Sequence, residues 1–287
     1  SALPDSIANE VEQPLAERGF CVISHALIHR LKREVPLVIP DINSDHLKLL
    51  ESQSFGTGSL ISCSNCMVVP IALTLYPLMA EYDFSSVNIV TEQSLSGGGR
   101  KMLERGRSGL TIDSSIPGES ESIISELNRI LGKKNEGIFQ EANLDVKVWC
   151  SRSSHDFGHL ATVEIIFSNN ISAHEIIEAW QNFSSDTFDS RLPSSSKILN
   201  FIDGKLDPIK HRWGDSIANL PDKNLSAGMS VYVGEIEVTG KKLKFKLLSD
   251  NTIRGAAGYG VLLAELLLAE EIIQDNYLTN TSFNRSN

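Results

Sequence analysis

Hydrophobic and polar positions follow two periods along this chain, and the change of period predicts where strands give way to helices. Three short apolar runs are typical of parallel strands: 20–24, 36–40 and the run from 60 into Cys66. Beyond Cys66 the apolar residues Val69, Leu73 and Tyr76 recur every three to four positions, so a helix follows at once. A strand, a helix and further strands in succession indicate a parallel α/β architecture.

Further segments have the pattern of helices. The first begins at Asp5 or Ser6 as N-cap and ends at Gly19. Its apolar residues share one side: Ile7, Val11 and Leu15. The other predicted helices are the amphipathic segment 116–132, the segment 172–183 and the apolar run 261–269, which follows a Gly/Ala-rich entry.

The middle of the chain alternates strand-like runs with polar turns. A strand at 87–93 runs into three glycines, and two more strand-like runs within 145–167 flank a polar turn. Residues 229–238 and 242–249 alternate apolar and polar positions, which predicts an antiparallel pair. The segment 184–228 is rich in Ser, Asp and Pro, and we expect it to be irregular.

The composition is that of an ordinary globular protein. With 287 residues, of which 41% are hydrophobic and 22% charged, the chain can form two domain-sized cores. It contains no apolar run of about eighteen residues and does not open with a signal-peptide pattern, so we expect a cytoplasmic protein that does not bind membranes. The net charge of −10, without a dense basic stripe, argues against nucleic acid as a partner.

Cysteine spacing raises the question of a metal. The chain has four cysteines, at 21, 63, 66 and 150, and two of them form a C-x-x-C pair, which is compatible with zinc or redox chemistry. A zinc site of this kind needs two more ligands at compatible spacing, and the sequence contains no second C-x-x-C. We therefore expect no metal site.

Cys66 is predicted to lie at a turn between a strand and a helix. Backbone N–H groups and the positive end of a helix dipole stabilise a thiolate there, so we expect a lowered thiol pKa and a nucleophile at neutral pH. The alternative is a buried cysteine that acts as a small hydrophobe. Arg30 also follows a predicted strand, and because parallel sheets bind ligands at the carboxyl ends of their strands, both residues can share one site.

Three later segments carry weaker signals. The glycines after Ser96 allow close backbone approach to a flat or anionic ligand, although glycine-rich loops are common. Glu119 and Glu121 fall in the first turn of a predicted helix, where carboxylates also simply complement the dipole. Arg152 and His159 stand near opposite ends of a polar turn, and each alone is better explained as an exposed arginine or a turn histidine.

These segments together resemble the aspartate-semialdehyde dehydrogenase family, most closely its archaeal and fungal branch, which also includes malonyl-CoA reductases. The resemblance rests on five motifs in order: N-C at the strand-to-helix turn, T-x-Q-S-L-S-G-x-G, I-P-G-E, C-x-R with G-H after it, and N-T-x-R-G-A-A-G. The opening SALP and the later VPLVIPDIN also match the second half of the family's dinucleotide-binding domain. The likeness extends to about residue 275.

The resemblance implies a cysteine-based oxidoreductase. Cys66 would attack an acyl phosphate to give a thioester that is reduced with NADP as cofactor, His159 would be the general acid/base, and Gln93 would orient the intermediate. Arg152 would bind the substrate carboxylate and Glu119 its ammonium group. The other implied contacts are to phosphate, from Arg30 and Asn65, and to the nicotinamide half of NADP, from Ser96, Gly97 and Asn251.

The implied fold is α/β in two parts. A partial Rossmann-like NADP-binding domain would comprise residues 1–65, completed by the C-terminal helix at 250–275. Residues 66–249 would form an α+β catalytic and dimerisation domain with a mixed or antiparallel sheet, and 276–287 a polar tail. The family resemblance further implies a homodimer or homotetramer that packs through this second domain.

Two features depart from the family pattern. Family members have a lysine three residues after the glutamate that matches Glu119, and here that position is Ser122, so the phosphate site would have one cation fewer. The sequence also starts after the family's first strand and its G-x-x-G-x-x-G phosphate loop. We therefore expect a dinucleotide-binding domain without its N-terminal first part, with one sheet edge open.

Three hypotheses follow. The first is an NADP-dependent aspartate-semialdehyde dehydrogenase that converts β-aspartyl phosphate to aspartate semialdehyde and phosphate, in lysine, threonine and methionine biosynthesis. The second is a reductase of a CoA thioester such as malonyl-CoA, for which Ser122 leaves room. The third is a truncated, non-catalytic paralogue that acts as a dimerisation or regulatory subunit. The joint presence of Cys66, Gln93, Arg152 and His159 argues against the third.

Overall fold

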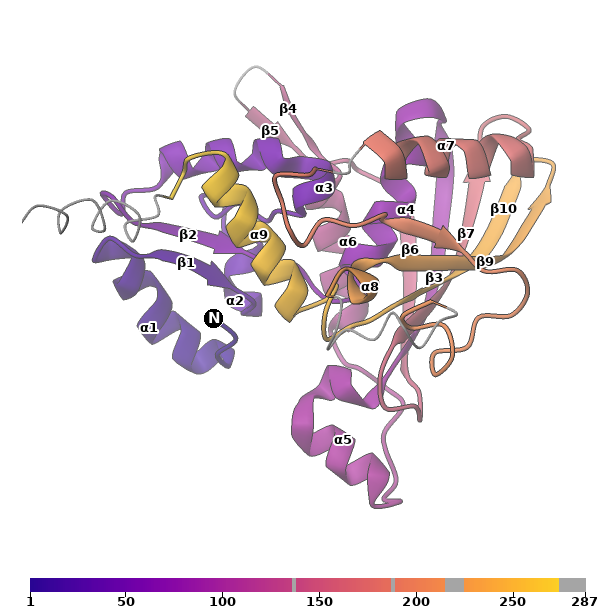
Figure 1. The fold of residues 1–287 in the computed structure, drawn as a ribbon, viewed down its shortest axis with the longest axis horizontal. Coiled ribbons are helices and arrows are strands. Elements are labelled where there is room, and N and C mark those ends of the chain that lie inside the picture. Colours follow the sequence, from indigo (N-terminus) through magenta and orange to yellow (C-terminus); the bar gives the residue numbers. More distant parts are fainter. Residues whose placement is uncertain (136–137, 187–188, 215–224, 274–287) are drawn as a thin grey trace, which may run out of the picture.

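Two sheets organise the chain. The computed structural model describes residues 1–135, 138–186, 189–214 and 225–273 (Figure 1). The strands of the larger sheet, in spatial order, are β6 (Val146–Arg152), β3 (Phe84–Gln93), β7 (His159–Phe167), β10 (Lys242–Ser249), β9 (Val231–Thr239) and β8 (Leu199–Phe201). The smaller sheet contains β1 (Cys21–Ser24) and β2 (Ser59–Ser62), which run parallel.

The small sheet has helices from both ends of the sequence packed on it. These are α1 (Asp5–Glu17) and α9 (Ala257–Ala269), so the C-terminal helix packs beside the N-terminal part of the chain (Figure 1). The run 36–40, predicted as a strand, makes only one bridge to β2, between Leu37 and Ser62. That prediction is wrong because Pro40 starts the short helix α3 (Pro40–Asn43) and ends the extended segment.

Helix α1 is where predicted, but it turns a different face inward. Ala8, Glu12 and Ala16 are buried, whereas the predicted apolar stripe is exposed by 36% or more: Ile7, Val11 and Leu15. The small alanines allow close packing of the helix on the sheet, and Glu12 has buried polar partners there. The predicted side-chain N-cap is wrong, because Pro4 precedes the first turn and no side chain caps it. The helix ends shortly before Gly19, whose φ of +93° suits the glycine that was predicted to stop it.

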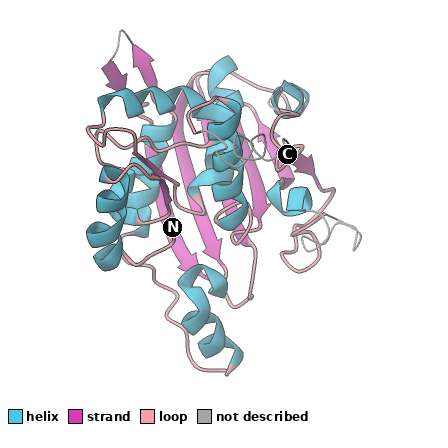
Figure 2. Cartoon of the chain, turned by 60° about the vertical axis from the view of Figure 1, so that its left-hand side comes forward, coloured by secondary structure: helices cyan, strands magenta, loops and turns pink. Residues whose placement is uncertain are grey.

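The larger sheet is mixed, as expected. Strand β3 runs parallel to β6 and antiparallel to β7, so it lies between two strands that follow each other in sequence. Three helices pack together on one face of this sheet (Figure 2): α4 (Val68–Glu81), α6 (Glu119–Ile130) and α7 (Ala173–Asp186). On the other face the paired residues Val90 and Trp149 are 45% and 55% exposed.

The remaining elements are short. Residues after β3 form η2 (Leu95–Gly98) and then α5 (Gly99–Arg107), which projects from the body and has no buried residue (Figure 1). The others are α2 (Leu27–Arg30), η1 (Ser44–Ser52), β4 (Lys133–Asn135), β5 (Ile138–Gln140) and α8 (Leu225–Met229). None of the described helices is long and apolar enough to cross a membrane. The predicted polar tail, 276–287, lies outside the described residues.

Candidate active site

A pocket of about 470 Å³ opens where β2, β3, α6 and the start of α9 meet. Its lining contains nine of the ten residues that the sequence predicts for the site: Arg30, Asn65, Cys66, Gln93, Ser96, Gly97, Glu119, Arg152 and Asn251. The tenth, His159, is fully buried and contacts Cys66 from behind the wall. Residues that are more than 200 positions apart in the sequence therefore converge on one cavity.

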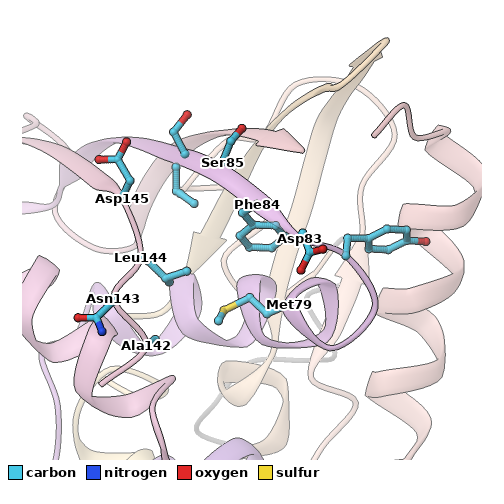
Figure 3. A pocket seen from close by; sticks show the side chains of 11 residues that line it. Met79, Asp83, Phe84, Ser85, Ala142, Asn143, Leu144 and Asp145 are labelled. Atoms are coloured by element: carbon cyan, nitrogen blue, oxygen red, sulfur yellow. The ribbon is translucent and has the colours of Figure 1, made fainter. Parts of the chain in front are cut away.

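A second pocket, of about 330 Å³, lies at the other end of β3. Met79, Phe84 and Leu144 contribute apolar side chains, and Figure 3 shows the carboxylates of Asp83 and Asp145 on opposite sides of it. No predicted site residue lines this pocket, and its lining contains neither a cysteine nor a histidine. Chemistry therefore belongs to the first pocket.

The nucleophile candidate sits on the turn between β2 and α4, as the sequence predicts. Cys66 Sγ is 3.2 Å from Nε2 of His159, the first residue of β7. The ring's other nitrogen, Nδ1, accepts the backbone N–H of Ser94 at 3.1 Å and lies at the same distance from the Ser94 hydroxyl. The N–H supports a ring protonated at Nε2, and the hydroxyl can accept a proton carried by Nδ1. The Ser94 N–H thus favours the tautomer with its proton on Nε2, and the Ser94 hydroxyl is the group that can accept from the other tautomer.

The predicted low thiol pKa is wrong for this pocket. Burial raises the pKa of the Cys66 thiol to about 12, the charge of Glu119 adds to the rise, and Arg30 opposes it. Burial also lowers the pKa of His159 to about 3, with Arg152 as the next cause. Without ligand the pair is therefore a thiol beside a neutral imidazole, because desolvation outweighs the stabilisation that the turn's N–H groups provide.

One carboxylate joins two of the predicted residues. Oε1 of Glu119 accepts the Asn65 side-chain N–H at 2.8 Å and the Gln93 side-chain N–H at 2.9 Å. Glu119 stands at the first position of α6, as predicted, while Gln93 ends β3. The acceptor thus faces the pocket between the two amides, next to Cys66.

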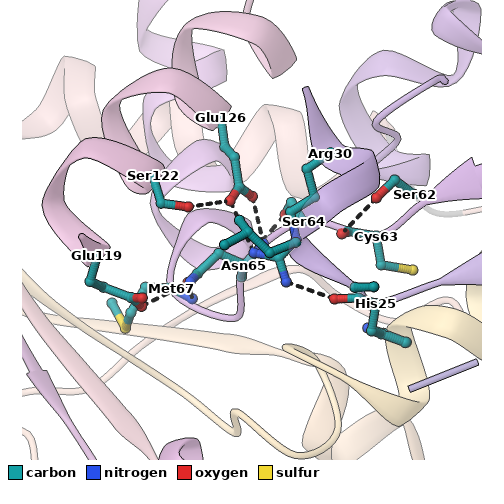
Figure 4. A network of polar contacts seen from close by, with 12 residues as sticks. His25, Arg30, Ser62, Cys63, Ser64, Asn65, Met67, Glu119, Ser122 and Glu126 are labelled. Carbon is teal, nitrogen blue, oxygen red and sulfur yellow. Dashed lines mark hydrogen bonds and ion pairs between the residues drawn. The ribbon is translucent and has the colours of Figure 1, made fainter. Parts of the chain in front are cut away.

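A residue that the sequence analysis did not single out, Glu126, lies at the centre of the network in Figure 4. It is fully buried, and Oε1 accepts Arg30 Nη1 at 3.0 Å and the Ser122 hydroxyl at 2.8 Å, while Oε2 accepts the Asn65 backbone N–H at 2.7 Å. Arg30 also donates to the His25 carbonyl at 2.9 Å. The sequence contained one indication of this role: Glu126 is a carboxylate on the apolar face of an amphipathic helix, where a charged side chain needs a buried partner.

Arg152 comes into the pocket through the sheet register. It is the partner of Gln93 in the parallel β3–β6 pair, and its Nη1 donates to the Ser94 carbonyl at 3.2 Å. A Cβ added at Gly97 would lie 3.1 Å from this Nη1 and 2.8 Å from the His159 ring. The glycine is therefore needed for close packing against catalytic candidates, in addition to any ligand approach.

Asn251 ties the loops of the pocket together. Its Oδ1 accepts the Gly158 N–H at 3.0 Å and the hydroxyls of Ser94 and Ser96 at 3.1 and 3.3 Å. A Cβ at Gly255, four residues on, would stand 2.6 Å from the Cβ of Cys66. The small residues at the start of α9 thus allow this segment to approach closely the turn that carries the nucleophile.

His25 and His29 are four residues apart, a spacing that can hold a metal, but their side chains point to different places. His25 lines the pocket, whereas His29 is fully buried beside Glu12, with Nε2 2.8 Å from a carboxylate oxygen. Among the residues that the structure describes, no group of three His, Cys, Asp or Glu side chains could hold a metal ion.

Comparison with known proteins first gives the class. Residues 1–50 match the family model described as "Semialdehyde dehydrogenase, NAD binding domain". The crystal structure of aspartate semialdehyde dehydrogenase with NADP from Candida albicans superposes with a TM-score of 0.76 at 26% identity, over 94% of this chain and 77% of that one. The fold and the pocket thus define a semialdehyde dehydrogenase, with the mixed α/β architecture expected from the sequence.

Curated relatives then give the family. The chain is 34% identical over 281 residues to the aspartate-semialdehyde dehydrogenase of Archaeoglobus fulgidus, covering 95% of this chain and 77% of the relative. It is 31% identical over 288 residues to the malonyl CoA reductase (NADP) of Metallosphaera sedula, covering 95% and 76%. This chain belongs to the aspartate-semialdehyde dehydrogenase family.

Proposed function

We propose that this chain is an NADP-dependent aspartate-semialdehyde dehydrogenase, which converts β-aspartyl phosphate to aspartate semialdehyde through a thioester on Cys66. The observation that carries the proposal is the 3.2 Å contact between Cys66 Sγ and His159 Nε2 at the wall of a pocket that also presents Arg152 and Glu119. Aspartate-semialdehyde dehydrogenases from archaea and fungi are among its relatives.

The substrate's two charged groups match the two ends of the pocket. Arg152 makes one described hydrogen bond, to the Ser94 carbonyl, so its other N–H groups remain for a planar carboxylate. The Glu119 carboxylate is the acceptor for an ammonium group. Burial raises the pKa of Cys66 and the charge of Glu119 adds to it, so a bound ammonium group would offset part of that rise.

The proton path follows from the two tautomers of His159. As Sγ attacks the acyl carbon, the thiol proton passes to Nε2, Nδ1–H donates to the Ser94 hydroxyl, and the C–O bond to phosphate breaks. NADPH supplies hydride to the thioester carbon when it is bound. His159 donates its Nε2 proton to the resulting oxyanion. As the C–S bond breaks to release the aldehyde, Nε2 takes the hydroxyl proton back and passes it to Sγ, which restores the thiol.

The cofactor's nicotinamide half fits the wall formed by Ser96, Gly97 and Asn251. Gly97 presents no side chain there, and the Ser96 hydroxyl and Asn251 amide are already fixed by bonds to each other. The phosphate leaving group would meet Arg30 and Asn65. Residues 1–65 with 250–275 would form the cofactor domain, and 66–249 the catalytic domain.

The proposal includes a homodimer or homotetramer. The supporting feature is the sheet face that carries Trp149 and Val90, two large apolar residues side by side and about half exposed. Trp149→Lys should lower the molar mass measured by light scattering, and an unchanged mass would contradict an interface at Trp149 and Val90.

We further propose a place in lysine, threonine and methionine biosynthesis, and a reducing cytoplasmic setting in keeping with four free cysteines.

A second candidate activity, reduction of malonyl-CoA, is favoured by one observation. Ser122 replaces the lysine expected from the family resemblance, and the remaining cation, Arg30, is already paired with Glu126. A thioester whose leaving group is a thiol would depend less on this weakened phosphate site. The known malonyl CoA reductase relative is 31% identical.

One assay on the purified chain tests both activities. Aspartate semialdehyde, phosphate and NADP should give NADPH formation that depends on phosphate and is lost in Cys66→Ala. Oxidation of NADPH with malonyl-CoA, without phosphate-dependent turnover, would select the second candidate. NADPH binding, followed by calorimetry, should be saturable; its absence together with no turnover on either substrate would select the non-catalytic paralogue.

A further inference from the structure

The turn that carries Cys66 is held through its own backbone. The N–H of Cys63 donates to a β1 carbonyl at 2.7 Å, and the N–H of Met67 donates to the Asn65 side chain at 2.7 Å. Between them, the N–H groups of Ser64 and Asn65 donate to side chains from two distant helices. In this described turn only the N–H of Cys66 donates no hydrogen bond to another residue.

Glu126, on α6, accepts the N–H of Asn65. Its Oε2 accepts the Asn65 N–H at 2.7 Å, one residue before the nucleophile, and its Oε1 is occupied by Arg30 and Ser122. A carboxylate without water contact is stable in one position only when every acceptor is used, as here. Glu126 therefore fixes the backbone of the turn and the guanidinium of Arg30 together.

Tyr259, on α9, accepts the N–H of Ser64. It is fully buried, and its hydroxyl accepts the Ser64 N–H at 3.3 Å while donating to the Val38 carbonyl. The hydroxyl thus connects the C-terminal helix, the segment before α3 and the nucleophile turn. No ligand can reach it, so any effect on turnover must pass through the backbone that it holds.

We propose that Glu126 and Tyr259 are positioning residues for the nucleophile. They fix the backbone of the Cys66 turn so that Sγ remains beside His159 and the Cys66 N–H remains free for the reacting group. The inference rests on the proposed function for the role of Cys66, but the fixed turn itself can be measured without turnover.

The experiment compares two variants with matched controls. Glu126→Gln and Tyr259→Phe remove the acceptor charge and the hydroxyl. Their controls are Glu12→Gln, which changes another fully buried carboxylate beside a basic side chain, and Tyr232→Phe, which removes another buried hydroxyl that donates to a backbone carbonyl. Kinetic constants with aspartate semialdehyde, phosphate and NADP are measured together with the pH dependence of Cys66 alkylation by iodoacetamide, followed by peptide mass spectrometry.

We expect kcat to fall about 100-fold in Glu126→Gln, as for a small displacement of a reacting atom. For Tyr259→Phe the fall is about three- to tenfold, the value of one hydrogen bond. KM for aspartate semialdehyde stays near that of the wild type in both. Alkylation of Cys66 in Glu126→Gln should shift to lower pH, because a nearby negative charge is lost. A variant with a lower thiol pKa and a lower kcat cannot owe its slower turnover to a less acidic thiol. The remaining explanation is that Sγ has moved away from its reacting position.

Two results would overturn the inference. One is a wild-type kcat in both Glu126→Gln and Tyr259→Phe. The other is an equal fall of kcat in the two controls, which would mean a general loss of stability. If the wild-type chain shows no turnover, the proposed function fails, and the alkylation rates of the fully ionised thiol decide the positioning role alone: equal rates in wild type, Glu126→Gln and Tyr259→Phe contradict it.

Discussion

Two fully buried carboxylates show how differently two parts of this chain use the same group. Glu12, on α1, lies 2.8 Å from His29 and accepts the Ser24 hydroxyl at 2.6 Å. Glu126, in the pocket, pairs with Arg30 and also accepts an N–H group of the nucleophile turn. Among described groups Glu12 leaves one oxygen without a hydrogen bond, whereas both oxygens of Glu126 are used.

The difference lies in the partner's charge. The partner of Glu126 is a guanidinium, the most weakly hydrated and most persistent cation among side chains, so the pocket carboxylate faces a cation in Arg30. Burial lowers the pKa of His29, which is therefore mostly neutral, and Glu12 opposes that shift. We infer that the Glu12 cluster, formed by Glu12, Ser24 and His29, serves stability, while the Glu126 network also serves chemistry.

The largest effect should come from separating chemistry from stability at two nearby cysteines. Cys66→Ala should reduce kcat about 10⁴-fold or more with little change in unfolding, because it removes the nucleophile from a cavity wall. Cys63→Ala, three residues earlier and fully buried, should keep kcat and lose about 1 kcal/mol of unfolding free energy. Steady-state kinetics and urea denaturation measure both. Equal kcat in the two variants would remove Cys66 from the proposed mechanism.

The next effect compares the carboxylates directly. Glu126→Gln leaves a mostly buried arginine without a counter-charge and should cost about 3–5 kcal/mol of unfolding free energy. Glu12→Gln leaves a histidine that is free to stay neutral, so the cost should be about 1–3 kcal/mol, that of an unsatisfied hydrogen bond. Urea denaturation of both variants provides the numbers. A larger loss in Glu12→Gln would break the distinction between the two networks.

The pH dependence of stability should reveal the Glu12 cluster. The pKa of His29 is lowered in the folded chain, so the unfolded chain binds more protons, and stability must fall as pH drops below the unfolded value of about 6.5. His29→Asn should flatten this fall by at most about 1.4 kcal/mol per pH unit. Glu12→Gln should steepen it, since the carboxylate is what partly restores the pKa of His29. Thermal unfolding between pH 7 and about 4.5 tests both variants.

Much of the fold was predictable because burial follows local periodicity. The helices at α4, α6, α7 and α9 and the β9–β10 pair lie where their apolar periods place them. Two predictions failed where neighbours in space decide the outcome. The run at 36–40 forms a single bridge to β2 in place of a strand, and α1 buries Glu12 in preference to Val11 because Ser24 and His29 supply polar partners.

The site was predictable in its members but not in its energetics. Ordered motifs brought Cys66, His159 and Arg152 together in prediction, and the structure places them at one pocket. The thiol pKa depends on burial, which is a property of the folded surroundings and not of the turn, so its rise could not be predicted from the local sequence. Glu126 was missed because its contacts are with residues 61 and 96 positions away.

The smallest effect should come from two serine hydroxyls. Ser94→Ala keeps the backbone N–H that supports His159 with its proton on Nε2, and it removes the hydroxyl that receives a proton from Nδ1. We expect kcat to fall about three- to tenfold with KM unchanged, since one hydrogen bond to the imidazolium is lost. Ser24→Ala removes a hydroxyl bonded to Glu12 and should instead lower the unfolding free energy by about 1–2 kcal/mol with kcat unchanged. If Ser94→Ala leaves kcat and its pH profile unchanged, the proton on Nδ1 has another acceptor. The Ser94 hydroxyl would then serve catalysis no more than the Ser24 hydroxyl does.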